Sequence, residues 1–423
     1  MRRRPSTRSL LFAVLVVAAL AGVPAGPPDP AAVVASLSRD PQVRRALSLA
    51  RDIEKQTIDD QIRFCEVPAP PFKETARGEV LRRAFIAAGL ENVRVDATGN
   101  VLGDRPGDRP RPRLVMAAHL DTVFPEETAV AIRREGNTLV GPGIGDNCRG
   151  LAVLVATARA LQKAVVRTPG SMTFVANVGE EGLGDLRGVK ALFGETMKNQ
   201  IDRFVAIDNA GMHISTVGVG SLRYRFTFTG PGGHSYAGFG MPNPANALGR
   251  AIAKISELQV ASAPRTTFNV GRIGGGTSVN AVPFESWMEI DLRSTDQSAL
   301  QALDANVREL VDAAVREENA RWRQTGSVAV ARELVGDRVA GSIANDAPIV
   351  QIALAVARRI GVPTSVGESS SDANLPLSLK IPAITIGGGG RSWHSHALDE
   401  SFDVSEAWKG TENAVLLAVS LAR

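Results

Sequence analysis

Cysteine is scarce in this 423-residue chain, which contains only Cys65 and Cys148. Two cysteines do not make a disulfide scaffold, so the fold must be held together by a hydrophobic core. The 44% share of hydrophobic residues is typical of a globular enzyme, and the length predicts two or three domains. The sequence leaves open whether the two cysteines form a bridge or remain buried free thiols.

An excess of charge is also absent once the first 25 residues are set aside. These residues carry four arginines and no acid, which accounts for the whole net charge of +4. Residues 26–423 are therefore close to neutral. A chain without a basic surface is not expected to bind nucleic acid.

No long hydrophobic run that could span a membrane is evident in the leader. Its apolar stretch, Leu10 to Val23, is too short for a span and has no stop-transfer pattern after it. Arginines precede the stretch, and small residues around Ala25 offer a cleavage site. We therefore predict a secretory signal peptide over residues 1–25, with export to the periplasm or the cell exterior and no membrane attachment after cleavage.

The glycine-rich segment 141–150 lacks the Gly-Lys-Ser/Thr ending of a phosphate-binding loop, and its spacing does not match a dinucleotide fingerprint. Both nucleotide-binding interpretations therefore fail. The segment instead carries Asp146, which is placed to accept a cation.

Acidic residues and a histidine follow three predicted buried strands, at the point where each strand ends. His119 and Asp121 follow the first strand, Glu180 and Glu181 the second, and Asp208 the third. The strands are predicted at residues 112–117, 171–178 and 204–207. Since ligands bind at the carboxyl ends of strands in open α/β sheets, we expect these side chains to share one site.

Residues 217–338 predict an inserted domain, because the order of their predicted strands and helices is that of a complete unit. Alternating strands and two helices follow one another in the order βαββαβ, which is typical of a ferredoxin-like unit. Residues 26–216, beginning with a helical region at 30–64, and residues 339–423 are then the two parts of one catalytic domain.

The order of the motifs is His-x-Asp, Gly-x-Gly-Asp-Asn, Glu-Glu, Asp, and finally a histidine four residues before a glutamate. This order resembles the co-catalytic di-zinc exopeptidase family, which includes peptidase T, carnosinase-type dipeptidases, aminoacylase, acetylornithine deacetylase and the glutamate carboxypeptidases. The resemblance covers essentially the whole mature chain. It implies an α/β fold in which a mixed-sheet, three-layer catalytic domain carries an inserted ferredoxin-like domain for closure and dimerisation.

The resemblance also implies a set of ligands for two zinc ions per chain, with manganese and cobalt suited to the same nitrogen and oxygen donors. The implied ligands are His119, Asp146, Glu181, Asp208 and His396. Asp146 would bridge the two ions, and Asp121 would orient the first histidine. His396 fits the family pattern better than His394 because it stands four residues before Glu400.

The remaining implied roles concern catalysis and substrate binding. Glu180 would be the general base, since it lies next to a ligand without being one. His234, Asn280 and Arg293 in the inserted domain match positions that contact substrate. The histidine would help to bind the oxyanion, either by closure within one chain or across the interface of a homodimer formed through the inserted domain.

We therefore predict an exported di-zinc aminopeptidase that cleaves short peptides. Asp208 resembles the residue used by di- and tripeptidases, although Asn209 and Ala210 depart from the glycines expected after it. The alternative is an N-acyl-amino-acid amidohydrolase or carboxypeptidase with the same metal site. A non-catalytic binding homologue would be expected only if a ligand were missing, and none is.

Overall fold

The computed structural model describes residues 29–322 and 326–423. The predicted signal peptide, residues 1–25, lies outside these residues. No helix within the described ranges is long and apolar enough to cross a membrane.

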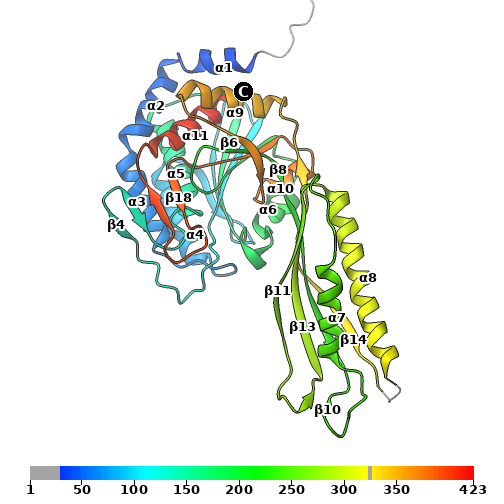
Figure 1. Cartoon of the computed structure of the whole chain (residues 1–423). Helices are drawn as coiled ribbons and strands as arrows, with labels where there is room; N and C mark the ends of the chain where they lie inside the picture. The colour runs from blue at the N-terminus through cyan, green and yellow to red at the C-terminus, as the bar shows by residue number, and fades with distance from the viewer. Residues whose placement is uncertain (1–28, 323–325) are drawn as a thin grey trace, which may run out of the picture.

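A mixed nine-stranded sheet forms the centre of the larger part of the molecule (Figure 1). Its strand order is β1-β2-β6-β3-β7-β17-β8-β15, and β16 pairs with β8. The neighbours β6, β3, β7 and β17 are parallel to one another. The strands are β1 (Glu91–Val95), β2 (Val101–Arg105), β3 (Arg113–His119), β6 (Ser171–Asn177), β7 (Arg203–Ile207), β8 (Ile214–Gly218), β15 (Gly341–Ser342), β16 (Val366–Ser369) and β17 (Ala383–Ile386).

Helices cover both faces of this sheet, which gives three layers and confirms the predicted fold class. One face packs against α1 (Pro30–Leu37), α2 (Pro41–Asp52), α3 (Glu54–Cys65), α4 (Thr75–Ala87), α5 (Cys148–Lys163), α9 (Pro348–Ile360) and α11 (Trp408–Leu421). The other face packs against α6 (Arg187–Ala191), the π-helix Leu192–Thr196 and α10 (Asn374–Ser378).

The helical region at 30–64 is broken into three helices rather than being continuous. Asp40 accepts hydrogen bonds from the first backbone N–H groups of α2, and Pro41 occupies the first helical position. Proline is favoured there because its missing N–H would have no partner at a helix start. A capped proline therefore starts a new helix instead of extending the old one.

A disulfide joins Cys65 at the end of α3 to Cys148 at the start of α5, and both residues are fully buried. This settles the alternative that the sequence left open. The bridge fastens the first turn of α5, and thus the loop that carries Asp146, to a neighbouring helix.

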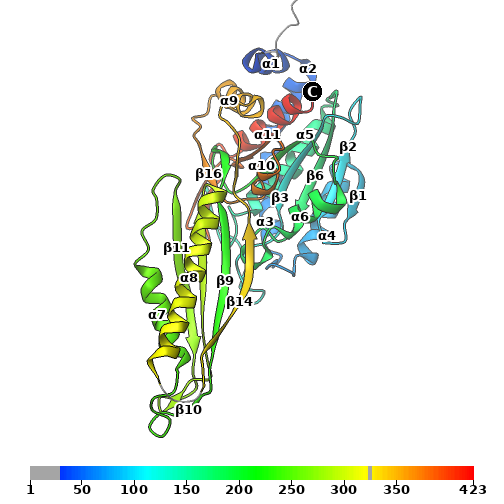
Figure 2. The same ribbon diagram turned by 90° about the vertical axis from the view of Figure 1, so that its right-hand side faces the viewer.

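Residues 220–338, here called the inserted unit, form a second sheet with its own hydrophobic core. Strands in the order β11-β13-β9-β14 pair antiparallel, and two helices pack against them. The elements are β9 (Gly220–Thr229), α7 (Pro244–Ser256), β11 (Thr266–Gly275), β13 (Glu285–Ser294), α8 (Gln297–Arg321) and β14 (Ala329–Arg338). The unit projects from the rest of the molecule, and β10 (Gly233–His234) lies at its far end (Figures 1 and 2).

A small sheet of order β18-β19-β5-β4 connects two distant parts of the chain. Its strands are β4 (Arg133–Glu135), β5 (Thr138–Val140), β18 (Arg391–Trp393) and β19 (Ser401–Asp403). Pairing of β5 with β19 places the loop after β5 beside the loop between β18 and β19. The first loop contains Asp146, and the second contains His396.

Candidate metal centre and active site

The three strand-end motifs meet because their strands are adjacent and aligned. His119 ends β3 and pairs in register with Asn177, the last residue of β6. On the other side, Ala117 of β3 pairs with Ala206, near the end of β7. Parallel neighbours that end together deliver the residues that follow them to one edge of the sheet.

Asp146 reaches the same edge from the glycine-rich loop, and Glu400 holds that loop in place. The buried Glu400 carboxylate accepts hydrogen bonds from the backbone N–H groups of Gly143 (3.0 Å), Gly145 (2.8 Å) and Asp146 (2.9 Å). Sequence reasoning used Glu400 only as a spacing marker. Its structural role could not be foreseen, because backbone donors leave no signal in the sequence.

Asp146 stands between two groups of ligand atoms. Its Oδ1 is 3.2 Å from His119 Nε2, and its Oδ2 is 3.4 Å from His396 Nε2. The first histidine nitrogen is also 3.5 Å from Asp208 Oδ1, and the second is 3.1 Å from Glu181 Oε1. The cluster thus consists of two half-sites, His119 with Asp208 and His396 with Glu181, which share one carboxylate.

The two histidines of segment 393–400 lie in different surroundings. His396 is half-exposed and contacts Asp146 and Glu181, whereas His394 has a side chain 63% exposed and bonds Asp399 at 2.9 Å. The structure therefore places His396 in the cluster and leaves His394 outside it.

Asp121 supports the cluster in a way that differs in detail from the prediction. Its carboxylate accepts hydrogen bonds from the backbone N–H groups of Glu180 (2.9 Å) and Glu181 (2.7 Å). His119 Nδ1 is 3.1 Å from the main-chain oxygen of Asp121 and 3.7 Å from the carboxylate of the same residue. One residue thus orients both the ring and the turn that carries the two glutamates.

The carboxylates of the cluster raise the pKa values of both of its histidines. Burial alone would lower the pKa of His119, but the nearby carboxylates of Asp121, Asp146 and Asp208 raise it well above its usual value. Contacts with Asp146 and Glu181 raise the pKa of His396 to about 10. These carboxylates therefore create a strong preference for positive charge at the centre of the cluster.

The residues fit a metal centre. Ligand atoms of His119, Asp146 and Glu181 lie within 4.8 Å of one another. The buried Asp146 Oδ1 has no hydrogen-bond partner among the described residues, although buried polar atoms normally have one. Imidazole nitrogens and carboxylate oxygens are suitable ligands for zinc, and Asp146 presents one oxygen to each half-site.

Glu180 takes no part in the half-sites and instead binds an arginine that sequence reasoning missed. Glu180 Oε1 is 2.9 Å from Arg338 Nη1, and both side chains are 5% exposed. Burial raises the pKa of Glu180 well above its ordinary value, and the Arg338 charge opposes that rise. No motif in the sequence marks Arg338, which is the last residue of β14.

At the position after Asp208, Asn209 stands where the family pattern predicts a glycine. Its backbone is left-handed, with φ of 61°, a conformation that favours glycine or asparagine. Its side-chain oxygen accepts a hydrogen bond from Ser392 at 3.0 Å. Asparagine therefore satisfies the backbone requirement that a glycine would otherwise meet.

Two of the three predicted substrate residues, His234 and Asn280, are not brought to the cluster within one chain. His234 lies in β10 at the far end of the inserted unit. Asn280 is close by, since its main-chain oxygen accepts a hydrogen bond from Ser235 N at 3.0 Å. Both residues are exposed. Arg293 lies in β13 and bonds Asp291 at 2.6 Å. It lines a cavity of about 250 Å³ together with Ser370, whose hydroxyl accepts a hydrogen bond from Arg338.

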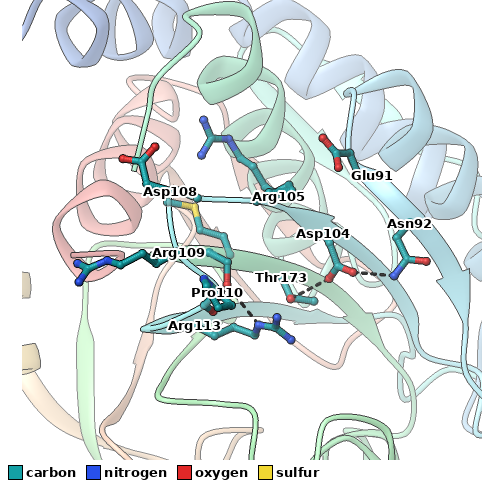
Figure 3. A pocket seen from close by; sticks show the side chains of 13 residues that line it. Glu91, Asn92, Asp104, Arg105, Asp108, Arg109, Pro110, Arg113 and Thr173 are labelled. Atoms are coloured by element: carbon teal, nitrogen blue, oxygen red, sulfur yellow. Dashed lines mark hydrogen bonds between the residues drawn. The ribbon is translucent and has the colours of Figure 1, made fainter. Parts of the chain in front are cut away.

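A further cavity of about 360 Å³ lies at the opposite end of the central sheet (Figure 3). It is lined by Arg113 and Ser171, the residues at which β3 and β6 begin. Figure 3 shows that Asp104 is already bonded to Asn92 and Thr173. None of the predicted site residues lines this cavity, so it is separate from the metal centre.

A three-layer α/β domain with two histidines and three carboxylates gathered at the carboxyl edge of its sheet defines a metal-dependent hydrolase. Residues 115–419 match Peptidase family M20/M25/M40, which covers most of the chain, and the protein belongs to this family of metallopeptidases and amidohydrolases. This confirms the family resemblance and the prediction of a metal-dependent hydrolase.

The chain is similar in sequence to several known proteins. It is 24% identical to the protein YqjE of Bacillus subtilis over 388 residues, covering 88% of this chain and 99% of the relative. It is 27% identical to carboxypeptidase G2 of Pseudomonas sp. over 313 residues, covering 69% of each.

Solved structures show the same fold. The aminopeptidase PepT of Bacillus cereus superposes with a TM-score of 0.70 at 22% identity, covering 88% of this chain and 99% of that one. The YXEP protein of Bacillus subtilis, described as a dinuclear metal-binding peptidase, superposes with a TM-score of 0.64 at 17% identity, covering 87% and 98%.

Proposed function

We propose that the protein is an exported aminopeptidase that releases residues from the free N-terminus of di- and tripeptides. The observation that carries the proposal is Asp208, whose carboxylate completes the half-site of His119 at 3.5 Å. Aspartate at this position resembles the tri- and dipeptidases of the family. The likeness of the fold to PepT and to a tripeptidase of Staphylococcus aureus supports the same subgroup.

The catalytic roles follow from where each side chain lies. A pair of divalent ions, when bound, supplies positive charge that polarises the scissile carbonyl and makes a water molecule more acidic. We propose His119, Asp208, His396 and Glu181 as the ligands of the two half-sites, with Asp146 shared between them. Asp121 holds the backbone of both glutamates and the ring of His119, so that the ligands keep their orientation.

Glu180 is the proposed general base. It is buried beside the cluster without contacting the half-site histidines, and the burial that raises its pKa makes its carboxylate a better proton acceptor. Glu180 takes a proton from the attacking water and returns it to the leaving amine. His234 contributes a hydrogen bond to the developing oxyanion when the end of the inserted unit reaches the cluster.

The position of His234 favours a homodimer. The residue is exposed at the far end of the inserted unit, so it approaches a metal centre either through a large closure or through a second subunit. We propose the second arrangement, in which each subunit contributes the end of its inserted unit to the other.

The proposed export rests on the leader at residues 1–25, and the Cys65–Cys148 disulfide supports it, because such bonds persist in oxidising compartments. N-terminal sequencing of protein from the periplasmic and culture fractions tests the export. A mature chain that begins near residue 26 is expected, whereas uncleaved protein confined to the cytoplasm would contradict it.

A second activity is favoured by a specific similarity, the 27% identity to carboxypeptidase G2. Three matched substrates separate the aminopeptidase from the carboxypeptidase: a tripeptide, its N-acetyl form and its C-terminal amide. N-acetyl amino acids are tested alongside them. An aminopeptidase cleaves the tripeptide and the amide but not the N-acetyl form. Cleavage of the N-acetyl peptide with release of its C-terminal residue, and no cleavage of the amide, would overturn the proposal.

A further inference from the structure

Arg338 binds both the side chain and the backbone of the proposed general base. Its Nη1 is 2.9 Å from Glu180 Oε1 and 3.1 Å from Ser370 Oγ, and its Nη2 donates to the main-chain oxygen of Glu180. Arg338 is the last residue of β14, the strand through which the chain leaves the inserted unit. A residue of the inserted unit thus reaches into the catalytic centre within the same chain.

Other contacts of the inserted unit hold the same loop without touching Glu180. Asp337 N donates to Asp185 Oδ1 at 2.7 Å, and Lys190 bonds the Asp337 main-chain oxygen at 2.8 Å. Arg223 Nη1 donates to the main-chain oxygen of Gly182 at 2.9 Å. These contacts fix the backbone of the loop, so the orientation of the Glu180 carboxylate depends on Arg338 in particular.

The pair is difficult to replace because both charges are buried. Arg338 and Glu180 are both buried. A buried carboxylate that loses its cation becomes costly to keep charged, and its side chain is free to adopt another rotamer. Lysine carries the same charge but lacks the planar fork that contacts two oxygens at once.

We propose that Arg338 is a positioning residue that holds the Glu180 carboxylate in the orientation needed for proton transfer, a role that rests on the proposed function of Glu180. The alternative is that Arg338 anchors a carboxylate of the substrate. Its surroundings disfavour this, because both terminal nitrogens already have partners in Glu180 and Ser370. Only Nε lacks a partner within the described part of the chain.

A double-mutant cycle tests the proposal, using Arg338→Ala, Glu180→Gln and the double variant. Arg338→Ala is expected to lower kcat by about 10–100-fold, the size seen when an outer partner of a catalytic centre is lost, with KM and metal content little changed. In the Glu180→Gln background the same substitution should leave the residual kcat unchanged, because the group through which Arg338 acts is gone. Added guanidinium should restore part of the activity of Arg338→Ala.

Two further variants keep the test independent of folding. Arg338→Lys should fold, keep its charge and give an intermediate kcat. Arg223→Ala removes a contact to the same loop at Gly182 and is the matched control, for which a much smaller loss of kcat is expected.

The outcomes separate the possible failures. If Glu180→Gln keeps near wild-type turnover, the proposed role of Glu180 fails, and the role of Arg338 fails with it. If Glu180→Gln is impaired but Arg338→Ala lowers kcat equally in both backgrounds, only the positioning role is wrong. A rise in KM confined to substrates with a free C-terminal carboxylate, with kcat preserved, would make Arg338 a substrate anchor instead.

Discussion

The metal centre and the far end of the inserted unit carry equally short sequence motifs, yet the two regions differ in their burial and in the contacts that support them. The centre is assembled from strand ends and loops that are largely buried, apart from the half-exposed His396, and that are held by hydrogen bonds to Asp121 and Glu400. The motif with His234 lies on an exposed two-residue strand at the opposite extreme of the molecule.

The difference agrees with the roles proposed for the metal ligands and for His234. Ligands that share two ions must keep their geometry, so they are held by a rigid framework with several contacts each. An oxyanion donor that acts with the substrate in place must be able to arrive and leave, so an exposed position on a separate unit suits it.

Asp146→Ala should have the largest effect, because both half-sites share this carboxylate. We expect loss of bound metal and of all measurable turnover, determined by elemental analysis of purified protein and by peptide hydrolysis. Asp399→Ala, which removes the exposed partner of His394, is the matched control and should keep its metal. Retention of two ions by Asp146→Ala would contradict the shared-ligand assignment.

Glu180→Gln should lower kcat by about 10²–10⁴-fold, the contribution of a general base, while metal content stays unchanged. Elemental analysis combined with steady-state kinetics checks this. A variant that lost its metal as well would show that Glu180 is a ligand rather than the base.

His234→Ala should lower kcat by about 10²–10³-fold, as for loss of one oxyanion donor, with little change in metal binding. His394→Ala removes another exposed histidine that lies outside the cluster and should remain close to wild type. Equal effects of the two substitutions would remove the distinction between the far end of the inserted unit and an ordinary surface position.

Replacing both Cys65 and Cys148 by alanine should affect turnover least and stability most. The bridge closes a sequence separation of 83 residues, and its loss should lower the free energy of unfolding by about 2–4 kcal/mol. Chemical denaturation of the variant and of reduced wild-type protein measures this. An unchanged midpoint would show that the bridge does not stabilise the framework around Asp146.

Much of the metal centre could be predicted from the sequence because most of its proposed ligands stand at or just after the ends of predicted strands. A buried parallel strand followed by an acid or a histidine places that side chain at the carboxyl edge, which accounts for His119, Glu181 and Asp208. Two parts of the site depend on contacts between distant segments and left no such signal. Glu400 acts through backbone N–H groups, and Arg338 reaches Glu180 across 158 positions of sequence.

The most direct test of the account is to mix Glu180→Gln protein with His234→Ala protein and follow peptide hydrolysis. In a mixed dimer, one active site has its own Glu180 and receives an intact His234 from the partner. After subunit exchange, equal amounts should recover about a quarter of wild-type activity, since about half of the dimers are mixed and each has one complete site. No recovery in subunits shown to exchange would contradict donation between subunits and leave closure within a single chain.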